Sequence, residues 1–315
     1  MRILVTGSRG PLGIAIQRIE NEISPTSQIC FTHSQILDLL DFSKVVSFFE
    51  EFRPELVIHL AARSGGAQIN RTHPTRAFED NIFMASNVLR AGAYVDTERF
   101  ILTSSTSAYP FRREIPASES HFFEGPPSES DKYYAYSKRL IETMAQAYRR
   151  EFGMKIWVPV VNGIAGAGMN FREEKSVMLA GIIKRFFTQY HSAERNEKYI
   201  VFGDGTPLRE YTYSLDLARA IRWLIYSEEE PMLINIGNSE SRTILEYAKL
   251  VASKIGIDLD LVHPELAITS GEKNYNQTTD NSLFLTKSGF LYSPIEVAIS
   301  EAVDHFAVTH GHDYL

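Results

Sequence analysis

Residues 1–14 read MRILVTGSRGPLGI and constrain the fold of this chain more than any other stretch. An apolar run at 3–5 is followed by Gly7, Gly10 and Gly13, a pattern typical of a buried strand, a tight turn and a helix. Gly7 permits the sharp turn, Gly10 leaves room for a phosphate, and Gly13 lets the helix pack closely on the strand. The helix start then offers unpaired N–H groups and a positive dipole end. This GxxGxxG stretch predicts a dinucleotide site, although an ordinary strand–turn–helix unit can carry the same glycines.

Strand and helix patterns alternate through the first half of the chain, which predicts an α/β fold of the Rossmann type. A doubly wound parallel sheet with right-handed crossovers is the expected architecture, because each strand is followed by an amphipathic helix. No internal repeat or low-complexity tract interrupts it. The predicted strands are 3–5, 29–31, 56–60, 99–102, 155–161 and 233–236, and the predicted helices are 46–52, 78–94, 134–152 and 214–227.

The alternation fails after about residue 165, where polar and glycine-rich pieces are mixed with single helices. We therefore predict a smaller, discontinuous α/β lobe that supplies substrate contacts. The predicted dinucleotide-binding domain covers 1–165, with 210–237 returning to it, and the predicted substrate lobe covers 166–209 and 238–315.

Composition excludes several classes of function. The 315 residues carry a net charge of −7 with no basic block, which argues against a nucleic-acid surface. No apolar run approaches the roughly 18 residues of a membrane span. Cys30 is the single cysteine, so no intramolecular disulfide is expected. With a strand at the very start of the sequence, we expect no secretory leader and a cytoplasmic protein. No metal site is predicted.

Tyr134 and Lys138 lie four positions apart in a predicted helix, about thirty residues after a serine-rich strand end that contains Ser105. Positions i and i+4 share a helix face. We expect the Lys138 ammonium to lower the tyrosine pKa from its usual value near 10 and to make Tyr134 a proton donor and acceptor. Ser105 could hydrogen-bond the same substrate oxygen. The alternative is a surface helix whose tyrosines pack against the core.

These motifs together resemble the extended short-chain dehydrogenase/reductases that act on nucleotide sugars, the NAD-dependent epimerase/dehydratase family. Within it, the sequence is most similar to the GDP-L-fucose synthases, which are NADPH-dependent epimerase-reductases. The general family matches are TGSRGPLG at 6–13, HLAA at 59–62, LTSS at 102–105, Tyr134 with Lys138, and GTPLREY at 205–211. The matches to the fucose synthases are the Gly-x-Arg-Gly turn, AARSGG at 61–66, Tyr109-Pro110, and MNF at 169–171 before a helix with KRF at 184–186.

The resemblance assigns cofactor-binding roles along the first half of the chain. Arg9 is implied to lie near the adenosine ribose, and the end of the second predicted strand, 32–34, has no acidic residue. An acid there would bind the ribose 2′-hydroxyl of NAD and repel a 2′-phosphate, so we expect NADP(H), with NAD as the alternative. The remaining implied cofactor contacts are Gly7, Gly10 and Gly13 at the pyrophosphate, Asp38 and Leu39 at the adenine, and Ala61, Ala62 and Arg63 along the channel.

In the second lobe, the resemblance implies that Arg209 grips the nucleotide diphosphate, for which its planar fork is suited. Asn170 matches a residue that approaches the sugar or diphosphate in relatives. Lys184 or Arg185 could add a second charge, although a solvated basic helix face is an equal alternative. Phe202 could stack on the base, although a strand phenylalanine often belongs to the core.

The sequence departs from the fucose synthases at their epimerising acid–base pair. Where they carry a cysteine two residues after the active serine, this chain has Ser107, and the helix start at 175–178 has no histidine. A serine hydroxyl is too weak an acid to replace a thiol there, which argues against double epimerisation. The NGIAG run at 162–166 replaces the Asn-x-Tyr-Gly of relatives, and the Thr-Asp-Glu run of the 4,6-dehydratases is missing.

We therefore expect NADP(H)-dependent reduction of a 4-keto nucleotide sugar, with Tyr134 as general acid. A nucleotide-sugar epimerase, either a C4-epimerase or a fucose-synthase-like epimerase/reductase, is the first alternative. A non-catalytic dinucleotide-binding module is the second. The predicted helices 78–94 and 134–152 form a dimer in relatives, so a homodimer is also expected.

Overall fold

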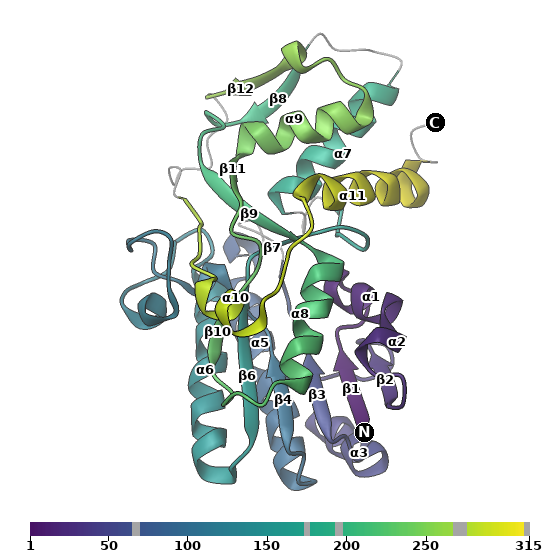
Figure 1. Ribbon diagram of the computed structural model, residues 1–315, viewed down its shortest axis with the longest axis vertical. Helices are drawn as coiled ribbons and strands as arrows, with labels where there is room; N and C mark the ends of the chain where they lie inside the picture. Colours follow the sequence, from purple (N-terminus) through teal and green to yellow (C-terminus); the bar gives the residue numbers. More distant parts are fainter. Residues whose placement is uncertain (65–69, 173–176, 193–197, 267–275, 312–315) are drawn as a thin grey trace.

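The structure is a computed structural model that describes residues 1–64, 70–172, 177–192, 198–266 and 276–311. A large parallel sheet forms the lower part of the molecule, and two small sheets lie beyond the carboxyl ends of its strands (Figure 1). This arrangement confirms the predicted Rossmann-type α/β fold.

The large sheet has seven strands in the order β10-β6-β4-β3-β1-β2, with β5 also pairing with β6, and every pairing is parallel. Side chains alternate across it: Ile3 and Val5 enter the core on one face, and Leu4 enters the core on the other. Both faces are therefore buried. The strands are β1 (Arg2–Thr6), β2 (Gln28–Thr32), β3 (Leu56–His59), β4 (Arg99–Leu102), β5 (Ser104–Ser105), β6 (Lys155–Val161) and β10 (Leu233–Ile236).

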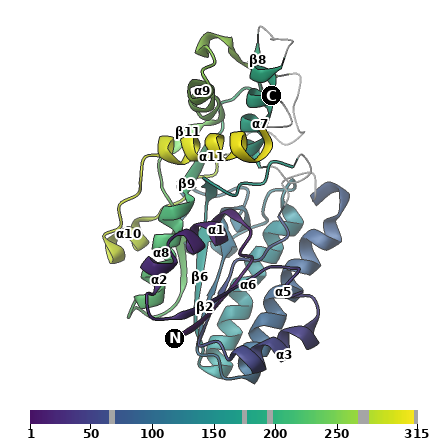
Figure 2. The same ribbon diagram turned by 90° about the vertical axis from the view of Figure 1, so that its right-hand side faces the viewer.

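Helices cover both faces of the large sheet (Figure 2). One face is covered by α1 (Pro11–Arg18) and α8 (Ser214–Tyr226), which contact each other beside the short α2 (Glu20–Ile23). The other face is covered by α3 (Phe42–Phe52), α5 (Pro74–Tyr94) and α6 (Lys132–Phe152).

Two helices begin four residues earlier than the sequence pattern predicts. At α3, the Asp41 carboxylate accepts hydrogen bonds from the backbone N–H groups of Ser43 and Lys44, so the helix starts at Phe42 rather than Val46. At α5, Pro74 occupies a first-turn position, where its missing N–H is not needed. Polar residues in each first turn, Ser43 and Lys44 in α3 and Thr75 and Arg76 in α5, interrupt the apolar pattern, which explains both differences.

Among the described residues, the upper part of the molecule holds two small sheets and three α-helices around a second core. That core contains buried aromatic side chains, among them Phe186, Tyr247 and Phe306. The three-stranded sheet has the order β11-β9-β7, and β12 pairs with β8. The elements are β7 (Gly163–Ala165), α7 (Met178–His191), β8 (Tyr199–Phe202), β9 (Leu208–Tyr213), β11 (Ser241–Thr243), α9 (Ile244–Ile255), β12 (Val262–Glu265) and α11 (Ile295–His310).

The predicted domain boundaries stay a proposal, with one change suggested by the packing. The strand β10 lies in the large sheet, in the segment expected to return to it. The helix α10 (Ser282–Ser288) contacts β10, and its Phe284 is fully buried in the core of the large sheet. The sequence places 238–315 in the substrate lobe, whereas we propose that α10 belongs with the dinucleotide-binding domain. None of the described helices is both long and apolar enough to cross a membrane.

Candidate active site

The carboxyl ends of the parallel strands open onto a cavity of about 820 Å³ between the large sheet and the upper part of the molecule. Parallel strands end at one edge of a sheet, so motifs far apart in the sequence meet there. Fifteen residues predicted for the site line this cavity: Gly7, Arg9, Gly10, Gly13, Asp38, Leu39, Ala61, Ala62, Arg63, Ser105, Ser107, Tyr134, Lys138, Asn170 and Arg209.

The three glycines form a turn that fits a dinucleotide pyrophosphate. Gly7 has φ +74°, and a Cβ there would lie 2.6 Å from the Ala61 backbone nitrogen. A Cβ at Gly13 would lie 2.6 Å from Ser8 Cα, so glycine is needed for α1 to pack against the turn. A Cβ at Gly10 would meet only the Gly7 carbonyl oxygen, at 3.5 Å, and its surroundings are otherwise open. The turn therefore presents bare backbone at the start of α1, where an anion binds favourably.

Polar side chains at the end of β2 border the glycine turn. The Arg9 guanidinium donates to Gln35 Oε1 at 2.8 Å, which holds it beside the cavity-lining His33. Asp38 accepts from the Leu40 backbone N–H at 3.1 Å and so belongs to its own turn. The sequence does not predict a role for Gln35, since that role appears only in its hydrogen bond to Arg9.

Arg63 is fixed by two neighbours on α5. Its backbone N–H donates to Asn81 Oδ1 at 2.7 Å, and its Nε donates to Asp80 Oδ2 at 2.9 Å. The side chain therefore lies in an ion pair beside the cavity. Residues 65–66 of the AARSGG motif lie outside the described residues.

Ser105, Tyr134 and Lys138 all line this cavity. Ser105 acts to lower the pKa of the Tyr134 phenol. The Lys138 Nζ lies 6.0 Å from the centroid of the Tyr134 ring and donates to the Thr103 carbonyl oxygen at 2.9 Å. A hydroxyl, a phenol and an ammonium therefore converge, as the spacing in the sequence predicts.

The predicted effect of Lys138 on Tyr134 is wrong for this structure. Desolvation raises the pKa of Tyr134 to about 12, with Ser105 acting to lower it and the Asp131 charge acting to raise it. Burial also lowers the pKa of Lys138 to about 8. Burial is the largest cause of both shifts, because the phenolate and the ammonium would each lose their hydration. At neutral pH, Tyr134 is a protonated phenol, which is the form a proton donor needs.

Buried polar residues without a predicted role support this group. Thr6 Oγ1 lies 2.9 Å from His59 Nδ1, and Thr103 Oγ1 donates to the His59 carbonyl oxygen at 3.1 Å. The Tyr134 backbone N–H donates to Asn70 Oδ1 at 3.1 Å in the first turn of α6. The sequence signal for His59 is a polar residue at the end of an otherwise apolar strand.

His59 predicts a loss of stability in acid. Desolvation, with a smaller contribution from the Lys138 charge, lowers its pKa to about 3. The unfolded chain binds a proton near pH 6.5, so His59 stabilises the fold above that pH, and this contribution is lost as the pH falls from 6.5 towards 3. From pH 7 to pH 5 the free energy of unfolding should fall by about 2 kcal/mol through this residue. Urea unfolding at both pH values should show a smaller fall for His59→Asn, whereas the control His263→Asn should keep the full difference.

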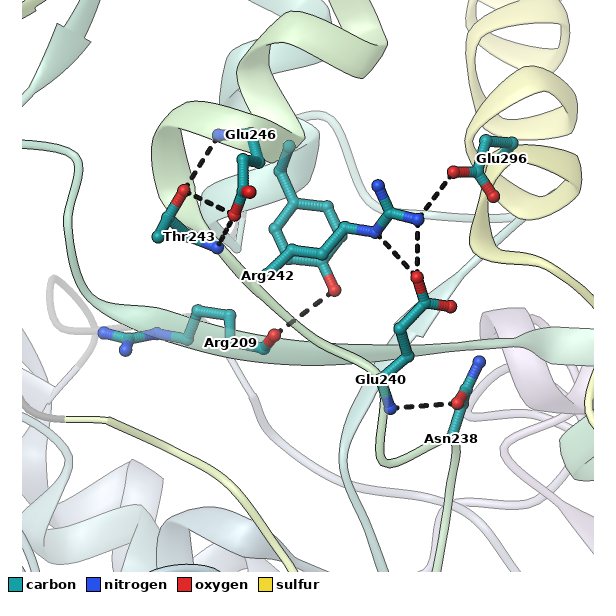
Figure 3. Close-up of polar contacts among 8 residues, drawn as sticks. Arg209, Asn238, Glu240, Arg242, Thr243, Glu246 and Glu296 are labelled. Carbon is teal, nitrogen blue, oxygen red and sulfur yellow. Dashed lines mark hydrogen bonds and ion pairs between the residues drawn. The ribbon is translucent and has the colours of Figure 1, made fainter.

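Arg209 reaches the cavity from β9. Its backbone is held in the upper core, where Tyr247 Oη donates to the Arg209 carbonyl oxygen at 3.3 Å. Figure 3 shows its side chain extending away from the cluster in which Arg242 bridges Glu240 and Glu296. The guanidinium Nη1 donates to the Leu208 carbonyl oxygen at 2.8 Å. The fold therefore separates the cavity-lining Arg209 from the structural Arg242.

Two residues predicted for the substrate site are not brought to the cavity. The Arg185 guanidinium lies 4.1 Å from the centroid of the Phe202 ring, and its Nη2 donates to the Ile200 carbonyl oxygen at 3.3 Å. Neither residue lines the cavity. The two side chains, from α7 and β8, stack on each other instead. The structure gives no support to a substrate contact by Arg185 or Phe202.

The cavity wall carries a residue that replaces part of the epimerising acid–base pair of the fucose synthases. Ser107 lines it, and its backbone N–H donates to Ser105 Oγ at 3.3 Å. Val177 caps the start of α7 and also lines the cavity. Residues 175–176 of the predicted helix start lie outside the described residues.

Known proteins and solved structures are similar to this chain over most of its length. GDP-L-fucose synthase from Dictyostelium discoideum is 29% identical over 96% of this chain and 94% of that protein. GDP-L-fucose synthase 1 from Arabidopsis thaliana is 31% identical over 82% of this chain and 79% of its own length. The crystal structure of a GDP-L-fucose synthetase from Naegleria fowleri bound to NADP has a TM-score of 0.86 at 29% identity, over 98% of this chain and 93% of that one. A family model described as the NAD dependent epimerase/dehydratase family matches residues 3–237, and the chain therefore belongs to that family.

Proposed function

We propose that this protein is an NADP(H)-dependent reductase of a 4-keto nucleotide sugar, with GDP as the favoured nucleotide. The observation that carries the proposal is the meeting of Ser105, Tyr134 and Lys138 in the cavity that the glycine turn also lines. Family membership and the GDP-L-fucose synthases among its relatives support the substrate class. A module that only binds a dinucleotide has no physical need for all three side chains.

In this proposal, Tyr134 is the general acid. Its phenol gives a proton to the C4 oxygen as the carbonyl carbon gains a hydride, so C=O becomes CH–OH. Ser105 holds the same oxygen by a hydrogen bond. Lys138 supplies a buried positive charge beside the phenol that stabilises the phenolate left after proton transfer. NADPH supplies the hydride when bound. Water from solution restores the Tyr134 proton.

The residues around the glycine turn favour NADPH over NADH. Arg9 is held at the end of β2 by Gln35, and the cavity-lining residues His33 and Ser34 follow that strand without an acidic side chain. A guanidinium attracts a 2′-phosphate, whereas an acid would select a 2′-hydroxyl. The structure from Naegleria fowleri, which is bound to NADP, supports this choice. NAD remains the alternative cofactor.

Reduction without C3 or C5 epimerisation is favoured over the fucose-synthase-like reaction. Ser107 and Val177 line the cavity, and neither side chain is an effective base near neutral pH. In D₂O we expect reduced product with no deuterium on the carbons that flank C4. Mass spectrometry of the product measures this directly, and deuterium at either carbon would support the epimerase/reductase instead.

A panel assay tests the proposed reaction. The protein is incubated with NADPH or NADH and with GDP- and UDP-linked 4-keto-6-deoxy sugars, and absorbance at the nicotinamide band is followed. Faster oxidation of NADPH than NADH, with reduced sugar nucleotide formed in equal amount, is the expected result. An epimer formed from these substrates without net NADPH oxidation would favour an epimerase that acts at the carbons flanking C4, since C4 itself is a carbonyl carbon with no configuration to invert. Tight NADPH binding with neither product would favour a non-catalytic module.

We also propose a homodimer in the cytoplasm. The long helices α5 and α6 pack side by side and expose the apolar side chains of Phe83 and Leu140. The single cysteine, Cys30, suits a reducing compartment. Sedimentation equilibrium should give twice the chain mass, and Phe83→Glu should shift that mass towards the monomer.

A further inference from the structure

Glu210 is a buried carboxylate beside Arg209 on β9, and the proposed reaction gives it no part. It is 4% exposed and lines the cavity. Its Oε2 accepts from Thr279 Oγ1 at 2.7 Å, and its Oε1 accepts from Ser241 Oγ at 3.2 Å. The Thr279 backbone N–H lies 3.1 Å from both oxygens, and Asn162 Nδ2 donates to Oε2 at 3.5 Å. These donors are neutral and belong to three separate segments of the chain.

A buried carboxylate held by neutral donors costs desolvation energy, so its position calls for an explanation. Glu210 joins β9 to the segment 276–280, which runs beside that strand. Two residues earlier on β9, the Leu208 carbonyl oxygen accepts from the Gln277 backbone N–H at 3.1 Å. The Leu208 N–H donates to Asn276 Oδ1 at 2.9 Å. The segment is therefore fastened to β9 at two points, Leu208 and Glu210.

Between these two points, β9 and the segment 276–280 each present a polar side chain to the cavity. Arg209 lies between Leu208 and Glu210, and Gln277 lies between Asn276 and Thr279, and both line the cavity. A guanidinium and a carboxamide in one cavity wall can both donate hydrogen bonds to the oxygens of a nucleoside diphosphate. Their mutual placement depends on the fastening on either side.

The segment also has support that is independent of Glu210. The Ala117 N–H donates to the Thr278 carbonyl oxygen, and the Asp280 N–H donates to the Ala117 carbonyl oxygen, both at 2.9 Å. Loss of the Glu210 carboxylate would therefore shift the segment locally and leave it attached to the rest of the protein.

We propose that Glu210 is a positioning residue for the nucleotide diphosphate of the substrate, because it fastens Thr279 to β9 and so sets Gln277 beside Arg209 at the cavity wall. This inference rests on the proposed function. Glu210 touches no reacting atom in this assignment. Its replacement should weaken nucleotide binding and raise KM, and it should leave kcat and NADPH affinity unchanged.

Binding of GDP, measured by calorimetry, tests this without relying on turnover. Glu210→Gln replaces one acceptor oxygen by an N–H₂ group, which cannot accept from the donors around it, and leaves the other oxygen as an acceptor for Thr279. GDP should therefore bind about tenfold more weakly. Thr279→Val keeps the backbone contact and should show a smaller loss in the same direction. The matched control is Glu246→Gln, which removes the carboxylate that accepts from Thr243 at the start of α9, outside the cavity. It should bind GDP like the wild type.

The outcomes separate this inference from the proposed function. If Glu210→Gln folds and binds GDP as tightly as the wild type, the inference is overturned, while NADPH oxidation by the wild type still supports the reductase. If Glu210→Gln lowers kcat and NADPH affinity together with GDP affinity, Glu210 is only structural. If it does not fold, Thr279→Val decides, and unchanged GDP binding by that variant also overturns the inference. If the wild type binds neither GDP nor UDP, the diphosphate site fails and the inference fails with it.

Discussion

Tyr134→Phe should lower kcat by about 10²- to 10⁴-fold, the usual contribution of general acid catalysis. The phenol hydroxyl is the only part removed, and it is the proposed proton donor. Lys138 donates its hydrogen bond to the Thr103 carbonyl oxygen rather than to the phenol, so the substitution leaves that contact in place. NADPH affinity should therefore be unchanged. Steady-state kinetics and fluorescence titration with NADPH measure the two quantities separately.

Tyr133→Phe is the matched control for that experiment. Tyr133 precedes Tyr134 on the same helix, is 42% exposed and does not line the cavity. It should keep wild-type kcat. Equal turnover by Tyr134→Phe and the wild type would remove Tyr134 from the chemistry, and equal losses in both variants would point to damage to α6.

Gly10→Ala and Gly13→Ala should both weaken NADPH binding by about 10- to 100-fold, but for different reasons. At Gly10 the new methyl group makes an ordinary contact with the Gly7 carbonyl oxygen and otherwise projects into open space, where the pyrophosphate is expected. The fold should keep its stability. At Gly13 the methyl group would lie 2.6 Å from Ser8 Cα, and backbone atoms there cannot move aside cheaply.

Gly13→Ala should therefore also lose about 1–3 kcal/mol of stability, the usual cost of overpacking. Thermal unfolding without added cofactor distinguishes the two variants, and NADPH titration measures their affinities. Gly153→Ala is a useful reference, because nothing lies within 4 Å of its added Cβ although its φ is +66°. It should bind NADPH normally. Normal NADPH binding by Gly10→Ala would contradict the placement of the pyrophosphate at this turn.

Much of the fold can be predicted from local pattern in this chain. The strands at 99–102, 155–161 and 233–236 have the predicted bounds, because buried strands of a parallel sheet are continuous apolar runs. The pattern predicts the helix starts at Phe42 and Pro74 four residues late, since polar residues interrupt their first turns and a cap or a proline fixes each start. The domain to which α10 belongs depends on which core buries Phe284, and no local sequence pattern specifies that core.

The sequence by itself determined the glycine turn and the spacing of Tyr134 and Lys138, because both depend on residues close together in the chain and on fixed backbone geometry. Only the tertiary structure decided that burial raises the pKa of Tyr134, that Arg185 stacks on Phe202, and that Glu210 fastens Thr279 to β9. Desolvation and long-range hydrogen bonds depend on which atoms surround a group, and those atoms come from segments far apart in sequence.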